Sequence, residues 1–128
     1  MNEEKRKKLG EKTLPLIKES REKAAQFNYA EIKLEQRTLM QKTFREQGER
    51  LENNLQLYVK GESFEIPEEE KDLLEHKLLK PLVVVHLAAS AIIDGSVGKI
   101  SEPQMKKMVR IRNLMKQIEK EVRHCFNK

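Results

Sequence analysis

The sequence predicts an all-α protein, a small helical bundle of four to five helices. Charged residues make up 37% of its 128 residues and hydrophobic residues 38%, a balance typical of amphipathic helices. Aromatic residues account for only 5%, and tryptophan is absent, which argues against the core of a β-sandwich. Five glycines and four prolines are too few for a chain rich in linkers. The length predicts a single helical domain over residues 1–128.

Two helix starts carry complete local signatures. Asn28 is a candidate N-cap with Glu31 three residues later, which is the spacing of a capping box. Ser101 repeats this pattern with Gln104 three residues later. The two signatures predict helices that begin near residues 28 and 101.

The other helix ends follow from glycine, proline and threonine. Gly61 and Gly95 each follow an apolar stretch and fit the position after a helix C-terminus. Pro67 precedes a run of glutamates that suits a first helical turn, and Pro81 predicts a kink or a restart. Thr13, two residues before another proline, is a candidate start for a first helix. The predicted helices lie near 13–27, 28–60, 67–79, 81–94 and 101–126.

Residues 81–94 are apolar on nearly every side, so we expect them to form the central, most buried helix. The helix over 28–60 would be about 50 Å long, whereas the helix over 81–94 would span only about 20 Å. Part of the long helix would then lack cover, and a second copy of the chain could supply it. A homodimer is therefore one expectation, and a monomer with other internal cover is the alternative.

The net charge and the composition of the N-terminal segment limit the classes of protein to which this chain could belong. The net charge of +5, from 26 basic and 21 acidic residues, permits a nucleic-acid or acidic partner without requiring one. The highly charged segment 1–12 does not resemble a secretory signal, and whether it is ordered stays open. The longest apolar run, 82–93, is shorter than a membrane span, so no membrane contact is expected. A single cysteine excludes an internal disulfide framework, and a cytoplasmic location is expected.

The most distinctive candidate site is a basic face on the outer side of the last helix. A helical face of one charge suits phosphate contacts, so nucleic acid or an acidic protein is a candidate partner. The favoured interpretation is a solvated face, or one that packs near the acidic segment 62–80. The candidate residues share an arc opposite the apolar stripe: Lys106, Arg110, Arg112, Lys116, Lys120 and Arg123.

His86 is the one strongly polar side chain in the apolar segment, with Ser90 one turn later. This arrangement resembles, in part, histidine phosphotransfer domains, which are small helical bundles with one reactive histidine. In those domains a lysine follows the reactive histidine. Here that lysine is absent, and Ala89 occupies its position. A core histidine that hydrogen-bonds Ser90 or a backbone carbonyl is therefore the favoured interpretation, and phosphotransfer is the alternative.

No other motif predicts chemistry. Glu121 and His124 form a single Glu-x-x-His, and no second copy exists to complete a di-iron site. Cys125 lies on the apolar stripe and fits a core position. Residues 95–99 resemble the end of a phosphate loop but lack its first glycine and its final serine or threonine. We therefore predict no catalytic residues, no metal and no cofactor.

These observations favour a non-enzymatic helical interaction or regulatory protein that binds another protein. The first alternative is a nucleic-acid-associated accessory protein that uses the basic face of the last helix. The second is a phosphotransfer protein that acts through His86.

Overall fold

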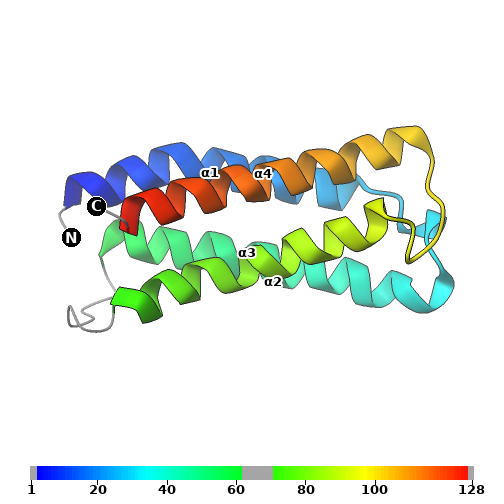
Figure 1. The fold of residues 1–128 in the computed structure, drawn as a ribbon, viewed down its shortest axis with the longest axis horizontal. Helices are drawn as coiled ribbons and strands as arrows, with labels where there is room; N and C mark the ends of the chain where they lie inside the picture. Colours follow the sequence, from blue (N-terminus) through cyan, green and yellow to red (C-terminus); the bar gives the residue numbers. More distant parts are fainter. Residues whose placement is uncertain (1–2, 62–70, 127–128) are drawn as a thin grey trace.

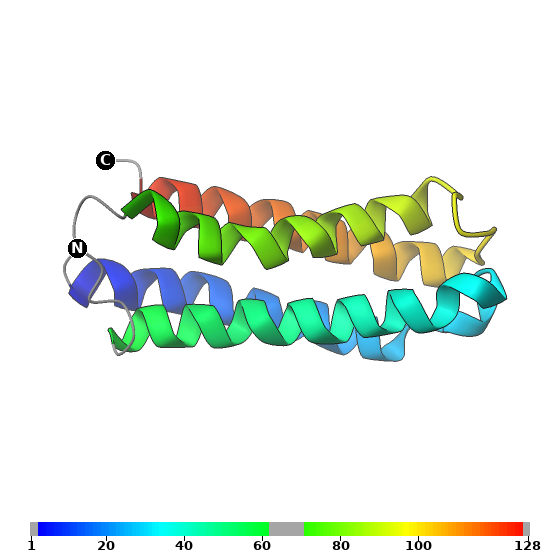
Figure 2. The same ribbon diagram turned by 90° about the horizontal axis from the view of Figure 1, so that it is seen from below.

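The computed structural model describes residues 3–61 and 71–126, which fold into an all-α bundle of four antiparallel helices (Figure 1). Neighbouring helices pack in a ring, in which α1 contacts α2 and α4, and α3 contacts the same two. Figure 2 shows the hairpin of α1 and α2 beside the hairpin of α3 and α4. The predicted fold class is confirmed. The elements are α1 (Glu3–Gln26), the 3₁₀ turn η1 (Tyr29–Glu31), α2 (Leu34–Lys60), α3 (Lys71–Ile93) and α4 (Glu102–Phe126).

The inward sides of α2 and α4 are apolar and buried. Tyr58 of α2 is buried in the core, as are three further residues of that helix, whereas Met40 is half-buried. On α4, the apolar stripe is buried from Met108 to Val122, and Cys125 and Phe126 at its end are half-buried. The buried core residues of these two helices are Phe44, Leu51, Leu55, Tyr58, Met108, Ile111, Leu114, Met115, Ile118 and Val122.

The first helix begins ten residues earlier than predicted. Thr13 and Pro15 lie inside α1, and the helix extends back to Glu3. Thr13 is fully buried and its hydroxyl donates to the carbonyl of Leu9 at 2.6 Å. Pro15 lies on the exposed side of the helix, where water can reach the carbonyl that proline leaves without a partner. The helix therefore passes through this proline, and most of segment 1–12 is helical.

Pro81 also lies inside a helix, so the predicted pair over 67–79 and 81–94 is one helix, α3, within the described residues. Proline lacks an N–H and leaves the carbonyl four residues earlier unpaired, which is that of Lys77. The side-chain amide of Asn54 on α2 donates to this carbonyl at 3.2 Å. The helix thus continues because a neighbouring helix supplies the missing donor. The start predicted at Pro67 lies outside the described residues.

The continuity of α3 removes the predicted mismatch in helix length. The four helices have 24, 27, 23 and 25 residues, so α2 is covered along its length by its neighbours. Residues 81–94 also do not form an enclosed axis. In a four-helix ring the core lies between the helices, and each helix keeps an outer side. On α3 this outer side exposes 41% of Val83 and 61% of Leu87.

The long helix begins at Leu34 rather than at residue 28. Asn28 caps only the turn η1, where its side chain accepts from the amide of Ala30 at 3.1 Å. The chain is extended at Ile32, whose side chain is buried, and the amide of Lys33 donates to the carbonyl of Val97 at 2.7 Å. The loop before α4 therefore draws this segment out of the helix.

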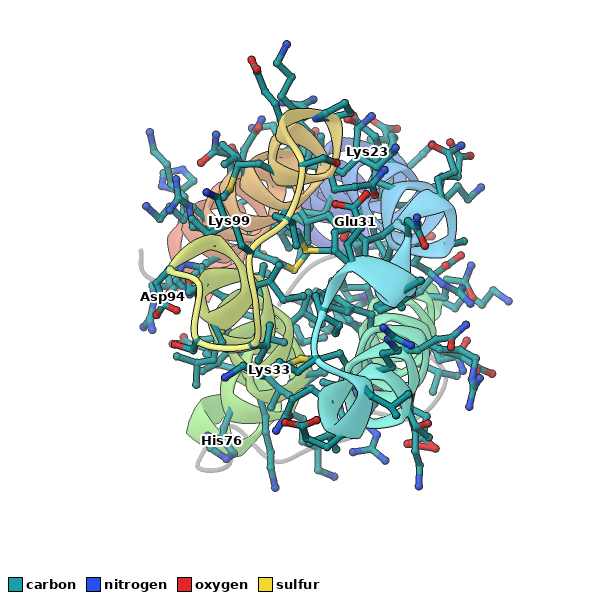
Figure 3. The ribbon with its side chains drawn as sticks, turned by 90° about the vertical axis from the view of Figure 1, so that its right-hand side faces the viewer. Lys23, Glu31, Lys33, His76, Asp94 and Lys99 are labelled. Carbon is teal, nitrogen blue, oxygen red and sulfur yellow. The ribbon has the colours of Figure 1, made fainter. Side chains whose placement is uncertain are left out.

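The two predicted capping boxes exchange their partners across the end of the bundle shown in Figure 3. Glu31 accepts from the amide of Ser101 at 2.6 Å and from its hydroxyl at 3.0 Å. Gln104 accepts from the amide of Asn28 at 2.8 Å. Each acceptor thus serves the backbone of the other loop, and we call this arrangement the crossed caps. The last predicted helix, over 101–126, is confirmed by α4.

The glycine positions after α2 and α3 are confirmed. Gly61 has a φ of 71°, and its amide donates to the carbonyls of Leu57 and Tyr58. Gly95 has a φ of 86°, and its amide donates to the carbonyl of Ile92. Both glycines adopt the left-handed conformation that ends a helix without the steric cost of a side chain.

Candidate interaction surfaces

The basic face of α4 lies on the outside of the bundle, as predicted. Five of its six residues are exposed, and Arg112 is half-buried, with its Nε atom buried and without a partner in the described part of the chain. Three of the remaining residues form ion pairs with carboxylates. The face is therefore less uniformly cationic than the α4 sequence alone indicates.

Arg110 forms the shortest of these ion pairs. Its Nε and Nη2 donate to the two carboxylate oxygens of Glu19 on α1, at 2.6 and 2.9 Å. This hydrogen bond holds the pKa of Glu19 below its ordinary value and raises the pKa of Arg110. The pair joins α1 to α4 and neutralises the centre of the basic face.

Arg123 is also held by carboxylates. It contacts Glu119 on its own helix at 2.9 Å and Glu75 on α3 at 3.8 Å. Lys106 lies 3.9 Å from Glu102 one turn earlier. Glu19 and Glu75 could not be placed beside α4 from its sequence, because they come from other helices. Lys116 and Lys120 are exposed, and neither has an ion pair within residues 3–61 and 71–126.

A cavity of about 350 Å³ extends the cationic surface from α4 onto α1. Glu121 on its wall forms an ion pair with Lys12 at 3.5 Å. Cys125 is half-buried beside the cavity, with its Sγ 3.7 Å from the hydroxyl of Tyr58. Burial raises the pKa of this tyrosine, which keeps it protonated. The cavity is lined by Lys5, Lys8, Leu9, Lys12, Glu121, His124 and Cys125.

The structure also places the remaining sequence motifs. His86 is half-buried, and it makes no hydrogen bond to Ser90 among the described residues. Among the described residues, which include Glu121 and His124, no group of three or more His, Cys, Asp or Glu side chains could hold a metal ion. In the loop at residues 95–99 the side chain of Val97 is buried, and its carbonyl accepts from the amide of Lys33 at 2.7 Å.

One surface was missed by the sequence reasoning. Along the outer side of α3, residues at intervals of three and four place two exposed apolar side chains, Val83 and Leu87, between two charged ones. The amide of Asp94 still donates to the carbonyl of Ser90 at 2.9 Å, so the helical register continues to the end of the row. We call this row the α3 stripe; it consists of Lys80, Val83, Leu87, Ala91 and Asp94.

Two signals in the sequence could have identified this stripe. Lys80, Leu87 and Asp94 recur at intervals of seven, which places them on one side of a helix. In addition, a segment without a polar side must expose apolar residues if it forms one corner of a bundle. The sequence reasoning missed this consequence because it placed the segment at the axis.

Helix α3 carries more apolar side chains than the core of the bundle buries. By length and composition, Glu75–Ile93 is the one helical segment among the described residues that could cross a membrane. The core helix of a bundle meets the same criteria, and 44% of this segment is buried inside the bundle. Burial accounts for its inner side, whereas Val83 and Leu87 lie outside the core.

The side of α2 that contacts α3 carries uncharged polar residues. Asn54 contacts α3, and Thr43 and Gln47 lie on the same side of α2, three and two turns earlier. Both are half-buried, and Leu39 nearby on α2 is 58% exposed. Charged residues adjoin this side of α2, because the exposed side chains of Glu46, Glu49 and Arg50 line a pocket together with Asn54.

Comparison of the chain with protein-family models, with curated proteins and with solved structures finds no match.

Proposed function

We propose that this chain is a non-enzymatic helical interaction protein that binds another protein through the α3 stripe. The observation that carries the proposal is the exposure of Val83 and Leu87, at 41% and 61%, on the outer side of α3. Adjacent exposed apolar side chains on a helix are a common docking element, because a partner helix or groove can remove both from water. Because each side chain is already partly buried, removing its remaining exposed area from water would contribute about 1 kcal/mol to binding.

The ends of the stripe support a specific interface. Lys80 and Asp94 are exposed and stand on either side of the apolar pair. Charges at the rim of an apolar patch orient a partner and exclude wrong registers more than they add affinity. The proposed surface thus combines an apolar centre with a polar rim.

A crosslinking and co-purification experiment in native extract tests the proposal. The tagged full chain is compared with Leu87→Glu, which places a charge at the centre of the stripe. Leu34→Glu is the matched control, because Leu34 is 73% exposed at the start of α2 and lies outside the stripe. We expect a partner that is lost with Leu87→Glu and kept with Leu34→Glu. A chain that recovers neither a second copy of itself nor another protein, or a partner that Leu87→Glu retains, contradicts the proposal.

A second candidate function is nucleic-acid binding by the basic face. It is favoured by Lys116 and Lys120, which are exposed and have no ion pair among the described residues. Phosphate contacts by such lysines release counterions, so binding should weaken steeply as salt is raised.

Charge reversal tests this candidate directly. The double variant Lys116→Glu and Lys120→Glu should lose retention of DNA and RNA at low salt. The control, Lys42→Glu with Arg45→Glu, makes the same change in net charge at exposed positions of α2. Equal retention by the wild type and the α4 variant would exclude the basic face, and equal loss in both variants would indicate a nonspecific effect of net charge.

A further inference from the structure

The α3 stripe is symmetric about Leu87. Lys80 and Asp94 are each seven residues from it, and Val83 and Ala91 are each four residues from it. The residues at equal distances from Leu87 differ in kind: the cation Lys80 corresponds to the anion Asp94, and the branched side chain of Val83 corresponds to the small one of Ala91. In an antiparallel pair of identical helices centred on Leu87, residue 80 of one copy lies beside residue 94 of the other.

Both charges are available for such a contact. Lys80 is exposed and has no ion pair within the described ranges. Asp94 lies on the outer side of α3 at the near end of the bundle in Figure 3. Its carboxylate accepts from the amide and the hydroxyl of Ser96, and these bonds lower the pKa of Asp94. The carboxylate is thus ionised at neutral pH and held in one place.

We propose that the α3 stripe is covered by the same stripe of a second copy of this chain, with the two α3 helices antiparallel and Leu87 at the two-fold axis. In this arrangement Lys80 of each copy pairs with Asp94 of the other. Val83 of each packs against Ala91 of the other, so a larger side chain meets a smaller one along the contact. This inference rests on the proposed function and specifies the partner at the proposed surface.

The contact is long enough to fix one register. From Lys80 to Asp94 the stripe spans about 21 Å, which is about four helical turns. If one helix slid by one turn along the other, Lys80 would lie beside an uncharged residue. Val83 would then no longer lie opposite Ala91 of the other copy. An isologous contact of this kind closes at two copies and does not propagate.

The first experiment measures the solution mass of the purified full chain over a range of concentrations. We expect twice the 15.1 kDa of one chain. Leu87→Glu should shift the mass to that of one chain with unchanged helical content by circular dichroism, and Leu34→Glu should leave the dimer intact. A wild-type chain that remains monomeric at every concentration overturns the proposal.

The second experiment tests the antiparallel register by exchanging charges. Lys80→Glu and Asp94→Lys, made separately, should each weaken the dimer by about tenfold, because each places like charges together twice. The chain that carries both substitutions restores the opposite pairs, and it should recover the wild-type dissociation constant. Additive weakening in the double variant overturns the register.

A cysteine at the axis provides an independent measurement. In a Cys125→Ser background, Leu87→Cys should form an intermolecular disulfide under mild oxidation, because a residue at a two-fold axis meets its own copy. Leu34→Cys is the matched control and should remain reduced. Equal crosslinking of the two variants, or none at residue 87, overturns the proposed axis.

The outcomes separate this inference from the proposed function. If Leu87→Glu abolishes a partner from extract but the purified wild type is monomeric, the second copy is wrong and the docking surface stands. If the purified chain is a monomer and no partner depends on Leu87, both are wrong.

Discussion

The side-chain amide of Asn54 donates to the backbone carbonyl of Lys77, which is the carbonyl that Pro81 leaves without a helical donor. Proline in a helix interior is costly because it removes this bond and crowds the preceding turn. Here a residue on α2 supplies the lost donor to α3. The bond also connects the two helices at one defined point along their length.

Replacing Asn54 with alanine should therefore destabilise the protein by about 1 kcal/mol, the typical value of one hydrogen bond. Pro81→Ala restores an N–H that can pair with the Lys77 carbonyl, so the same change should cost less in that background. A double-mutant cycle from urea denaturation measures the coupling. Additive effects of the two substitutions would show that the amide does not compensate for the proline.

The crossed caps predict a loss of protection at sites remote in sequence. Glu31→Ala should expose the amide of Ser101, and Gln104→Ala should expose the amide of Asn28, because each loses its acceptor. Each change should lower the free energy of unfolding by about 1 kcal/mol. Hydrogen exchange measured by NMR checks the pairing. If Glu31→Ala left the exchange of the Ser101 amide unchanged, the exchanged pairing would be wrong.

Gly10 lies where α1 approaches α2 closely. A Cβ at this position would lie 2.7 Å from Cγ2 of Val59, so Gly10→Ala should destabilise the protein by about 2 kcal/mol despite the better helix propensity of alanine. Adding Val59→Ala should recover most of this loss, as measured by chemical denaturation.

Gly48→Ala is the matched control for this prediction. Its Cβ would lie 3.3 Å from Cγ of Arg21, so a shift of that side chain by a few tenths of an ångström would accommodate the added methyl group. The gain in helix propensity should then leave stability unchanged or raised. A loss at Gly48 as large as that at Gly10 would contradict the contact with Val59 as the cause.

The ion pair of Glu19 and Arg110 predicts a dependence of stability on pH. The arginine lowers the pKa of the glutamate in the folded state, so the folded state releases this proton more readily than the unfolded state. The stabilisation is fully present above the ordinary glutamate pKa, about 4.3, and is lost as the pH falls through the lowered value.

Arg110→Gln should therefore reduce the free energy of unfolding near neutral pH and have no effect through this pair in strong acid. Denaturation curves at the two conditions test this, and an NMR titration of the Glu19 carboxylate should show its pKa rise in the variant. Lys106→Gln is the control, since Lys106 and Glu102 lie 3.9 Å apart on one exposed turn. A pKa of Glu19 that does not change in Arg110→Gln would contradict the assignment.

The start of α4 and the ends of α2 and α3 could be predicted because their signals are local. Gly61 and Gly95 end their helices through backbone conformation, and Ser101 precedes α4 as its spacing indicates. Pro81 and Thr13 misled the prediction because their effect depends on what packs beside them. A partner such as Asn54, from a different helix, cannot be located from the sequence around the proline.

Part of the candidate site could likewise be predicted from the sequence, and part of it could not. Helical spacing placed Lys116 and Lys120 on an exposed face, which the structure shows. It could not place Glu19 beside Arg110, because 91 residues separate them and only the packing of α1 on α4 brings them together. The exposure of Leu87 likewise follows from the position of α3 in the ring rather than from its own composition.

The crossed caps make the two hairpins complementary halves. Asn28 and Glu31 belong to the hairpin of α1 and α2, whereas Ser101 and Gln104 belong to that of α3 and α4. Each hairpin contributes one amide donor and one side-chain acceptor that only the other hairpin matches. A turn grafted from an unrelated protein into one loop would therefore remove a hydrogen-bond partner from the other loop, before η1 in one hairpin or before α4 in the other. Any redesign must alter the two loops together.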